Sequence, residues 1–543
     1  MHKRAWLFHI RLLAGFIAAA WLYTAFLELW GHDSWFHLQR LEDVAQQVSR
    51  GQFHMYLAEN AAQGKGLPVW IYYSQWVYWP GLLPRLLGVS PLISLKLVYG
   101  VFLVVCCAGC YRLLRLETDE ATAAFGTLLF VTSNYVIGEI FQRAAYAEFM
   151  SVSLLPFLLV ALHRTLDGGM RSATALALLA SLMILFHPLS FMNAGCAVVA
   201  YAAHTATRRR IAYRRLLRVV APLALALALT AFYWLPAVVE TRYVRGAEGV
   251  PTPLRDTFLG WRYLNFSGAT SLGLVLTSLA AAVAASLLLA RRKSDAARSL
   301  WSWPLVVGIG VYVFLTLSIS EPLYIAFPLL AANLWAWRVL FPLILLVVIF
   351  LAANFDGLAP RLRTDTALRA FAVVAVLQAA VFVLWNSAEE LSLRRIDAAE
   401  IEREVAVESQ RTAGFGIDEY LPHPRMAPGP GDRCTATRTV STEGRYEMSF
   451  VIAPHEAGSC IHVPRYWNTR YAAAIDGTAT PVYADADGEI VIVPDGRAGV
   501  VTLRFTRPAY VTLSMVLSSV AAVLLLAVVA GGLLAKPAGV TVR

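Results

Sequence analysis

The sequence predicts a polytopic α-helical membrane protein of about twelve spans, with a β-sandwich-like domain outside the cytoplasm before the last span. Of its 543 residues, 58% are hydrophobic and 15% are charged, a composition typical of chains that bury several helices in lipid. Many apolar runs reach about 18 residues or more, which is enough to cross the hydrocarbon of a bilayer. After residue 434 the pattern changes to short alternating stretches separated by Asp-Gly pairs, which are typical of a small β domain.

The net charge of +10 lies largely in short segments between the apolar runs, most clearly in RRRIAYRRLLR at residues 208–218. Short basic loops of membrane proteins face the cytoplasm, so this charge indicates orientation rather than a nucleic-acid surface. With about twelve spans, every basic loop falls on the same side. We therefore expect both chain termini in the cytoplasm and residues 386–508 outside it.

The first apolar run, residues 5–29, follows Lys3 and Arg4 and lacks a small-residue cleavage site, so we expect a retained first span. It leads to an outer segment at 31–90, and a second large outer loop is expected at 240–268. The chain then divides into a transmembrane domain, an outer α+β domain, and a final span with a cytoplasmic tail: residues 1–385, 386–508 and 509–543. Among the other expected spans are residues 91–114, 121–138, 219–239, 301–319 and 510–534, and a fifth span that reaches His187 and Pro188.

The outer segment contains an amphipathic stretch at residues 41–53, followed by the aromatic sequence WIYYSQWVYWP at residues 70–80. Clusters of tryptophan and tyrosine are typical of the interface between membrane and water, and we interpret this one as such an interfacial belt. A platform that binds a sugar or a lipid is the alternative.

Residues 386–508 begin with a charged, helix-like stretch and continue with the turn sequences IDG at 475, DADGE at 485 and PDGR at 494. Their spacing of about 8 to 12 residues predicts the hairpins of a small β-sandwich. Cys434 and Cys460 are the only cysteines of this region, so they can pair as a disulfide if the region is exported. The four other cysteines lie in or beside apolar runs, where we expect a small apolar role.

GHDSWFHLQR, residues 31–40, follows the first span directly. Asp33, His37 and Arg40 are spaced i, i+4 and i+7 and so share one face of a helix. One interpretation is a catalytic face, on which Asp33 removes the proton of an acceptor hydroxyl beside cations that bind a phosphate. The structural alternative is that Asp33 only caps an interfacial helix whose polar face is solvated.

Further polar groups are expected on the same side of the membrane. GEIFQRAAYAEF carries Glu139, Arg143 and Glu148, and LWAWR ends with Arg338. A charge at the head of an apolar span is costly without a partner of opposite sign, so Arg338 indicates an anionic neighbour. His187 lies where proline breaks the fifth span; it is either a contact for a substrate or a hydrogen-bonded histidine that fills the kink. Because these segments share one side, we expect them to converge on a common site.

An anion that fits such a site is a lipid-linked phosphosugar, whose prenyl tail lies between the spans. Arginine binds phosphate through two parallel hydrogen bonds, so Arg40, Arg143 and Arg338 are candidates to hold the leaving phosphate. His37, on the face of Arg40, is a further substrate-binding candidate. Asp33 would remove the proton of the acceptor.

Short motifs along the chain resemble those of a known superfamily. They are HDSWFHLQR at 32, RAAYAEF at 143, HPLSF at 187, LWAWRVLFP at 334, DEYLP at 418, RYWNTRYAAAIDG at 465 and IVIVPDG at 490. Together with an acidic residue just after the first span, many spans and an outer C-terminal domain, they resemble the GT-C membrane glycosyltransferases. The chain is most similar to the bacterial YfhO-like and "6-pyruvoyl-tetrahydropterin synthase-related" membrane proteins, although no motif indicates pterin chemistry.

The resemblance implies an enzyme of the bacterial cytoplasmic membrane that moves a sugar, with inversion, from a polyprenyl-phosphate donor to an extracytoplasmic glycan, lipid or polymer. It makes Asp33 the counterpart of the catalytic acidic residue, and Glu148 the counterpart of the acidic residue in the second outer loop. Two departures are visible: no proline precedes the Trp337–Arg338 pair, and the motif of oligosaccharyltransferases is absent, which argues against N-glycosylation of proteins. Some GT-C enzymes use a divalent metal and others use none, so the cofactor stays open.

Two other functions stay open beside this one. A flippase or transporter of a lipid-linked saccharide would share the helices and the contacts with anionic lipid, but it would need no base at Asp33 and would not explain the outer β domain. A non-catalytic subunit of a machine that assembles envelope polysaccharide is the second. The expected partners include membrane lipids and lipid-linked saccharides, and no nucleic acid.

Overall fold

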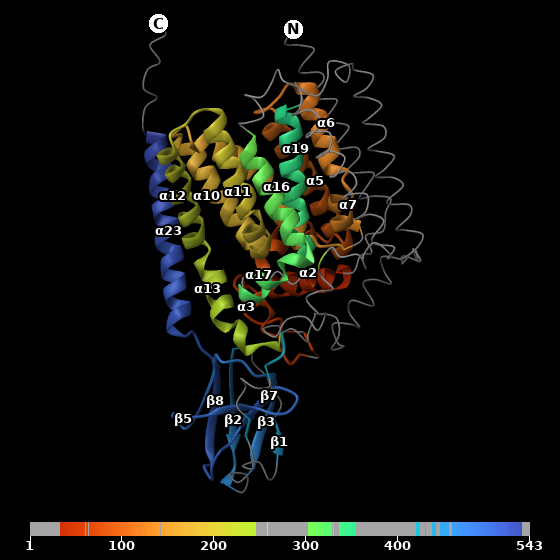
Figure 1. Cartoon of the computed structure of the whole chain (residues 1–543). Coiled ribbons are helices and arrows are strands. Elements are labelled where there is room, and N and C mark those ends of the chain that lie inside the picture. The colour runs from red at the N-terminus through yellow and green to blue at the C-terminus, as the bar shows by residue number, and fades with distance from the viewer. Residues whose placement is uncertain are drawn as a thin grey trace, which may run out of the picture.

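The computed structural model describes residues 33–245, 258, 302–354, 420–423, 429–430, 437–440, 446–454 and 459–534, except 60, 63, 142, 328, 329 and 331–335. In these residues a bundle of helices lies at one end and a small all-β part at the other (Figure 1). The predicted first, eighth and eleventh spans lie outside the described residues, as does the helix-like stretch after residue 386.

Within the described residues, three helical segments are long and apolar enough to cross a membrane: Pro91–Leu114, Tyr146–Thr165 and Ala509–Gly531. Two bent pairs of helices meet the same criterion together, which raises the number to five. This apolar helical architecture agrees with the predicted class of protein. The count of twelve spans extends beyond the described part and stays a prediction.

The first described helix, α2 (Ser34–Ser49), lies across the end of the bundle that faces the β part (Figure 1). Leu38, Leu41 and Val44 on its buried side pack into the main core. The helix ends before the predicted limit of residue 53, because Gly51 adopts φ +84° just beyond it. Three short helical elements complete the outer segment: α3 (Val69–Tyr72), η1 (Gln75–Tyr78) and α4 (Trp79–Leu86).

An interfacial belt would be exposed along its whole length, but the aromatic sequence at residues 70–80 is partly buried. Trp70 and Tyr78 are only 4% and 0% exposed and belong to the protein core. Trp76 and Trp79 are half-buried. The belt interpretation is therefore wrong for the buried members of this segment.

Helix α5 (Pro91–Leu114) has the bounds predicted for the second span. The third predicted span is instead broken into α6 (Glu120–Val131) and α7 (Asn134–Phe141). The break follows Thr132, whose hydroxyl donates a hydrogen bond to a carbonyl of the preceding turn and so competes with the helix. The chain continues with α8 (Tyr146–Ser153), α9 (Leu155–Thr165), α10 (Met170–Phe186) and α11 (Pro188–Arg208).

The span predicted at 219–239 is bent by 69° between α12 (Leu217–Leu229) and α13 (Ala231–Glu240). Thr230 lies at the bend, and its hydroxyl donates back to the Ala226 carbonyl. The bend carries α13 toward the β part (Figure 1). The other helices are α16 (Trp303–Thr316), α17 (Glu321–Ala326), α19 (Leu340–Asn354) and α23 (Ala509–Leu534), with the short turns η2 (Tyr213–Leu216), η3 (Thr241–Tyr243), η7 (Ser318–Ser320) and η8 (Ala336–Val339).

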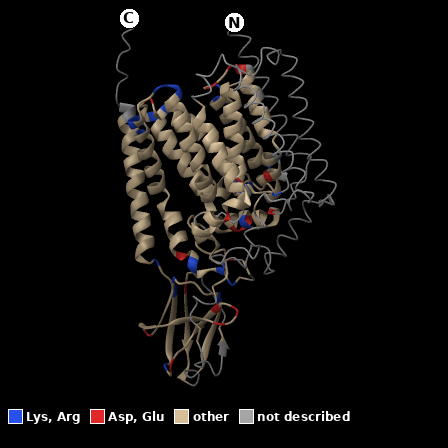
Figure 2. Cartoon of the chain, viewed as in Figure 1, with Lys and Arg blue, Asp and Glu red and all other residues tan. Residues whose placement is uncertain are grey.

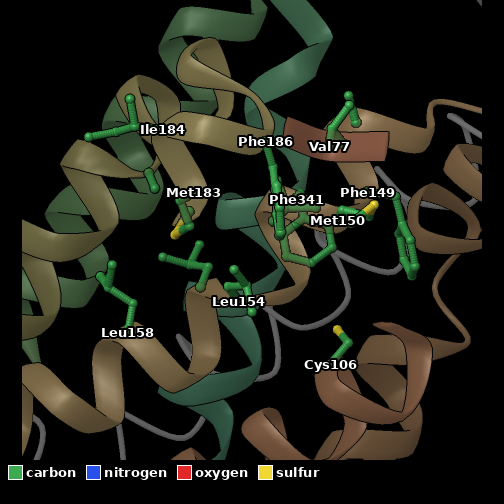
Figure 3. Close-up of a cluster of buried hydrophobic side chains, with 14 of the residues drawn as sticks. Val77, Cys106, Phe149, Met150, Leu154, Leu158, Met183, Ile184, Phe186 and Phe341 are labelled. Atoms are coloured by element: carbon green, nitrogen blue, oxygen red, sulfur yellow. The ribbon is translucent and has the colours of Figure 1, made fainter. Parts of the chain in front are cut away.

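The described helices close around a large apolar core. Figure 3 shows part of it, where side chains of α8, α10 and α19 meet: Phe149, Met150, Met183, Phe186 and Phe341. Full burial of such a side chain stabilises the fold by about 1.5–3 kcal/mol. The same packing fixes α8, which carries Glu148, and α19, which directly follows the η8 turn that carries Arg338.

The β part consists of two four-stranded sheets, in the orders β1-β3-β7-β6 and β2-β8-β4-β5. Ile461 and Ile492 of the first sheet share one buried cluster with Val501 and Leu503 of the second. The sheets therefore pack face to face, as the predicted sandwich requires. The strands are β1 (Thr437–Thr439), β2 (Glu447–Ile452), β3 (Cys460–Tyr466), β4 (Tyr471–Ile475), β5 (Thr478–Thr480), β6 (Val482–Ala484), β7 (Glu489–Ile492) and β8 (Gly499–Phe505).

The IDG and DADGE sequences form the predicted hairpin turns, between β4 and β5 and between β6 and β7. In the first turn, Asp476 and Gly477 both have positive φ, as a two-residue type I′ turn requires. PDGR also forms a turn, but it joins β7 to β8, which belong to different sheets. The third hairpin prediction is therefore wrong, because turn residues bend the chain without selecting the partner strand.

Among the described residues, ion pairs join the β part to the bundle. Arg470, just before β4, donates from Nε and Nη2 to one oxygen of Glu240 at the end of α13, at 2.8 and 2.5 Å. Both side chains of this pair are fully buried. Lys65 of the outer segment pairs with Glu489 of β7.

Cys460 is disulfide-bonded, whereas Cys106, Cys107, Cys110 and Cys196 are free. Cys434, the predicted partner of Cys460, lies outside the described residues, so that pairing stays a prediction.

Among the described residues, Lys and Arg gather at the end of the helices farthest from the β part (Figure 2). Acidic and basic residues occur together at the opposite end, close to α2 (Figure 2). The bundle therefore has one basic end and one end of mixed charge.

Candidate functional site

Three polar segments meet at the end of the bundle that faces the β part. The backbone amide of Asp33 donates a hydrogen bond to the carbonyl of Arg143, at 2.9 Å. Arg143 Nη1 lies 3.0 Å from Glu148 Oε2, and Arg338 Nε lies 3.4 Å from the same oxygen. The segments that carry Asp33, Glu148 and Arg338 are therefore in contact, although they lie far apart in the sequence.

A tight turn between α7 and α8 positions Arg143. Its amide donates to the Gly138 carbonyl, and the amide of Ala145 donates to the Glu139 carbonyl, each at 2.9 Å. Ala144 between them adopts φ +52°, a conformation that is unfavourable for a residue with a Cβ atom. Strain of this kind concentrates at functional sites. The turn thus holds Arg143 over the start of α8.

Glu148 is the centre of a network of charges, which we call the Glu148 network: Glu139, Arg143, Glu148 and Arg338. Oε2 of Glu148 contacts both arginines, and the hydroxyl of Tyr135 donates to Oε1 at 3.4 Å. Arg143 also pairs with Glu139. The two carboxylates are 1% and 4% exposed, whereas the Arg143 and Arg338 side chains keep 16% and 13% exposure. The arginine side chains are therefore partly exposed, whereas the two carboxylates are buried.

Burial raises the pKa of the Glu139 carboxyl to about 7, although the adjacent Arg143 acts in the opposite direction. Glu139 Oε2 makes no hydrogen bond, so this oxygen is desolvated without compensation. Glu139 therefore changes its charge close to neutral pH. When it takes up a proton, Arg143 loses one of its anionic neighbours.

Asp33 occupies the N-cap position of α2, but its side chain makes no capping hydrogen bond. The capping alternative therefore lacks the bond on which it depends. Asp33 directly precedes α2, and it is half-buried. Its backbone amide is hydrogen-bonded to the Arg143 carbonyl. Its place beside the Glu148 network is compatible with a role in chemistry.

The face that His37 and Arg40 share is buried, not solvated: the two residues are 2% and 1% exposed. His37 Nδ1 lies 2.8 Å from the hydroxyl of Tyr78. Burial lowers the pKa of His37 well below its usual value, and the charge of Arg40 acts in the same direction. The imidazole is therefore neutral at pH 7, so any contact it makes with a phosphate is a hydrogen bond and not an ion pair.

Arg40 is held in a cage of aromatic rings. Its guanidinium carbon lies 4.1 Å from the ring centroid of Phe36 and 4.0 Å from that of Tyr73, distances that favour cation–π attraction. Nη2 donates to the hydroxyl of Tyr420 at 3.4 Å. Arg40 thus links α2 to the DEYLP motif, 380 residues along the chain.

His187 ends α10 and caps α11. Its Nδ1 accepts a hydrogen bond from the Ser190 amide at 3.2 Å and lies 2.7 Å from the Ser190 hydroxyl. These are the contacts expected of a histidine that fills a proline kink. Of the two roles that the sequence leaves open for His187, the geometry supports that of a hydrogen-bonded histidine at the kink.

The tyrosines that line the site were not predicted from the sequence. The ring of Tyr78 stacks on Tyr146 at 5.8 Å, and Tyr135 reaches Glu148. Two of these three lie in motifs already noted, WIYYSQWVYWP and RAAYAEF, which were the available signal. Within the described residues, no three His, Cys, Asp or Glu side chains are grouped as a metal site requires.

A family model described as the 6-pyruvoyl-tetrahydropterin synthase related domain, a membrane protein, matches residues 72–391, more than half of the chain. The chain belongs to this family. The matched region of this pterin-synthase-related family includes the whole Glu148 network, whereas α2 and the two sheets lie outside it. Membership confirms the family resemblance carried by the sequence motifs, and it classes the chain as a membrane protein. No curated protein matches the chain.

Two solved structures show weak likeness to the chain. The mycobacterial arabinofuranosyltransferase AftD has a TM-score of 0.43 at 16% identity, over 69% of this chain and 26% of that one. The oligosaccharyltransferase AglB of Archaeoglobus fulgidus, solved with an inhibitory peptide and a dolichol-phosphate, has a TM-score of 0.39 at 11% identity, over 79% of this chain and 62% of that one. The chain thus spans about a quarter of AftD and about three fifths of AglB.

Proposed function

We propose that the chain is an integral-membrane glycosyltransferase that moves a sugar from a polyprenyl-phosphate donor to an extracytoplasmic glycan, lipid or polymer. The observation that carries this proposal is the Glu148 network beside Asp33. It combines two partly exposed arginine side chains with the Asp33 carboxylate, at one end of an apolar bundle. An anionic group on a long apolar tail is the ligand class that suits both features.

The proposed roles follow from what each group can do in such a reaction. The acceptor hydroxyl oxygen attacks the anomeric carbon, the bond from that carbon to the phosphate oxygen breaks, and the hydroxyl proton passes to Asp33. Arg143 and Arg338 stabilise the charge on the departing prenyl phosphate. Glu148, the second acidic residue of the site, holds both arginines on one oxygen, and we assign it a positioning role. Arg40 and His37 are buried residues of α2, the helix that follows Asp33, and they form the adjoining part of the site.

The proposed location is the bacterial cytoplasmic membrane, with the β part outside. The gathering of Lys and Arg at the far end of the described helices supports this orientation, because basic ends face the cytoplasm (Figure 2). It also puts the Glu148 network on the outer side, where an extracytoplasmic acceptor is available.

The test is transfer by the purified full chain in proteoliposomes supplied with radiolabelled polyprenyl-phosphate pentoses and hexoses. Asp33→Asn keeps the size of the side chain and removes its basicity. We expect normal expression and thermal stability, with transfer reduced about 10²-fold or more, the scale for loss of a general base. Glu42→Gln on the same helix, which forms a half-buried pair with Arg85, is the matched control and should keep wild-type transfer.

Near-wild-type transfer by Asp33→Asn would show that the base lies elsewhere. A chain that moves the labelled donor across the bilayer without transferring its sugar would be a flippase or transporter. A chain that does neither alone, but restores polysaccharide synthesis in membranes that lack it, would be an assembly subunit.

A further inference from the structure

The basic end of the bundle carries an exposed segment that takes no part in the proposed chemistry. Helix α11 ends there in a Schellman motif, in which the amide of Ile211 donates to the Ala206 carbonyl at 2.8 Å. Arg210 adopts φ +52° in this motif, at a position that glycine usually occupies. The chain then turns into one continuous helix, Tyr213–Leu229, which consists of η2 and α12.

The first turns of this helix have an exposed apolar face. Tyr213, Leu217 and Val220 are spaced i, i+4 and i+7 and therefore share one side of the helix. Tyr213 and Leu217 are 66% and 68% exposed, and Val220 is exposed as well. Val219, on another side of the helix, is buried in the main core. The apolar face is therefore turned away from the bundle.

Two arginines stand beside this face without a partner. Arg214 and Arg215 are exposed, and in the part of the chain that the structure describes neither side chain makes an ion pair or a hydrogen bond. Arg218, one turn after Arg214, is instead tied to the bundle, because its Nη1 donates to the Leu166 carbonyl at 3.1 Å. We call Arg214 and Arg215 the exposed arginine pair.

Two acidic residues of the basic end already have cationic partners. Asp167 accepts hydrogen bonds from Nη1 and Nη2 of Arg209, at 3.3 and 2.7 Å. Glu117 is buried and pairs with Arg208. The charge of the exposed arginine pair therefore adds to the basic character of this end, which Figure 2 shows. An anion from outside the protein would be attracted to it.

The apolar face places the exposed arginine pair at the surface of the membrane. The helix pair Tyr213–Leu229 and Ala231–Tyr243 is together apolar enough to cross a membrane. An apolar side of a span that faces away from the protein lies in lipid, and the first turn of the span then lies at the headgroups. Tyrosine is typical of that level, since its ring is apolar and its hydroxyl is polar. The exposed arginine pair is therefore within reach of lipid phosphates.

A phosphate with a net negative charge suits this arrangement best. Guanidinium groups bind phosphate oxygens through parallel hydrogen bonds. A zwitterionic lipid brings its own ammonium group to the same place, whereas an anionic phospholipid does not, so the anionic lipid gains more from two uncompensated arginines. A soluble acidic protein would match the charge but would leave Tyr213 and Leu217 without an apolar partner. The combination of the two faces thus favours a lipid.

We propose that the start of helix Tyr213–Leu229 is a binding site for an anionic phospholipid, whose phosphate lies on the exposed arginine pair and whose upper acyl chain lies along Tyr213 and Leu217. The site lies at the end of the bundle opposite to the Glu148 network, so it does not depend on the proposed glycosyl transfer (Figure 1). A bound lipid would fasten the turn between α11 and α12 to one leaflet.

The test is native mass spectrometry of the full chain in a neutral detergent, titrated with dioleoylphosphatidylglycerol or dioleoylphosphatidylcholine. We expect the first phosphatidylglycerol to bind about ten-fold more tightly than phosphatidylcholine, and Arg214→Gln/Arg215→Gln to lose this difference. Leu217→Ser should weaken the binding of both lipids, because it removes the apolar contact. All three substituted side chains are exposed, so thermal unfolding of the variants should match that of the wild type.

The matched control is Arg112→Gln/Arg115→Gln, which removes the same charge from the end of α5. Both arginines are exposed, but no large apolar side chain beside them in the sequence is. They are also engaged within the protein: Arg115 Nη1 donates to the Thr118 carbonyl, and Arg112 lies 5.5 Å from the ring centroid of Phe157. This control should keep the preference for phosphatidylglycerol.

Four outcomes would overturn the proposal. Equal affinity of the wild type for the two lipids would exclude an anionic-lipid site. Equal losses in the two double variants would mean that the whole basic end attracts the lipid and that no site exists at η2. Displacement of the lipid by inorganic phosphate at millimolar concentration would indicate a site for a soluble anion. Binding of polyglutamate without binding of phosphatidylglycerol would indicate a docking surface for an acidic protein.

Discussion

Two buried groups of arginine and glutamate in this molecule are built differently. In the Arg470–Glu240 pair, one guanidinium meets one carboxylate and neither side chain has any exposure. In the Glu148 network, two arginines share a single carboxylate oxygen, and both side chains keep some exposure. Removal of one partner of a fully buried pair strongly destabilises a protein, because the other charge is left buried alone. Such a pair is suited to joining two parts of a fold. A shared carboxylate with partly open cations can exchange one contact for a ligand. Both groups bury charge. The candidate site differs from the Arg470–Glu240 joint in that two arginines share one carboxylate and both remain partly exposed.

The largest effect expected from this comparison is on stability. Glu240→Ala leaves the Arg470 charge buried without its partner and should lower the free energy of unfolding by about 3–5 kcal/mol. The measurement is chemical denaturation of the purified chain in detergent. The control is Glu447→Ala, which breaks an exposed pair with Arg504 and should cost about 1 kcal/mol or less. Equal losses in the two variants would mean that the sealed pair is not the joint we infer.

The second effect is on donor recognition and separates the network from the joint. Arg338→Ala should raise the donor KM, or lower kcat/KM, about ten-fold or more, because a charged hydrogen bond contributes roughly 1.5–3 kcal/mol. Arg338→Lys should recover only part of this, since the planar fork is lost. Arg504→Ala, on the surface of the β part, should have no effect on the donor. Normal donor binding by Arg338→Ala would make this arginine structural.

The smallest effect is a dependence on pH. Because the folded-state pKa of Glu139 is about 7 and its ordinary value is near 4.5, its contribution to stability is greatest below pH 4.5 and is lost as the pH rises through 7. As the pH falls through 7, neutral Glu139 leaves more of the Arg143 charge available for phosphate. Donor binding should therefore tighten a few-fold between pH 8 and pH 6.

Glu139→Gln should remove this pH step and hold donor binding near its low-pH strength. Glu42→Gln, on the half-buried side of α2, should leave the step in place. A wild-type profile without a step, or a step that persists in Glu139→Gln, would contradict the assignment to Glu139. Measurement of donor affinity at several pH values for the three proteins decides between these results.

The elements predicted best are those in which several local signals agree. For α5, Ser90 accepts from the Ile93 amide, Pro91 takes the first helical position, and one apolar run continues to Leu114. The breaks at Thr132 and Thr230 were missed because hydrophobicity continues across both. There a hydroxyl competes for a carbonyl of the preceding turn, an interaction that an apolar pattern does not reveal.

At the site, the sequence could identify charged residues but not their surroundings. The i, i+4, i+7 spacing of Asp33, His37 and Arg40 correctly placed two of them on one helical face. It could not show that this face is buried, because the cage around Arg40 needs Tyr420 from a distant segment. The neutral state of His37 follows from that burial and was equally out of reach.

The connection between β8 and α23 has a mechanical consequence. Strand β8 ends at Phe505 and α23 begins at Ala509, so three residues lie between the sheet and a helix apolar enough to cross a membrane. Such a segment extends about 14 Å at most. The β part therefore has a fixed orientation relative to the bundle, because the short connection and the Arg470–Glu240 pair hold it at two points. Reorientation of the β part relative to the bundle would therefore require breaking this buried pair.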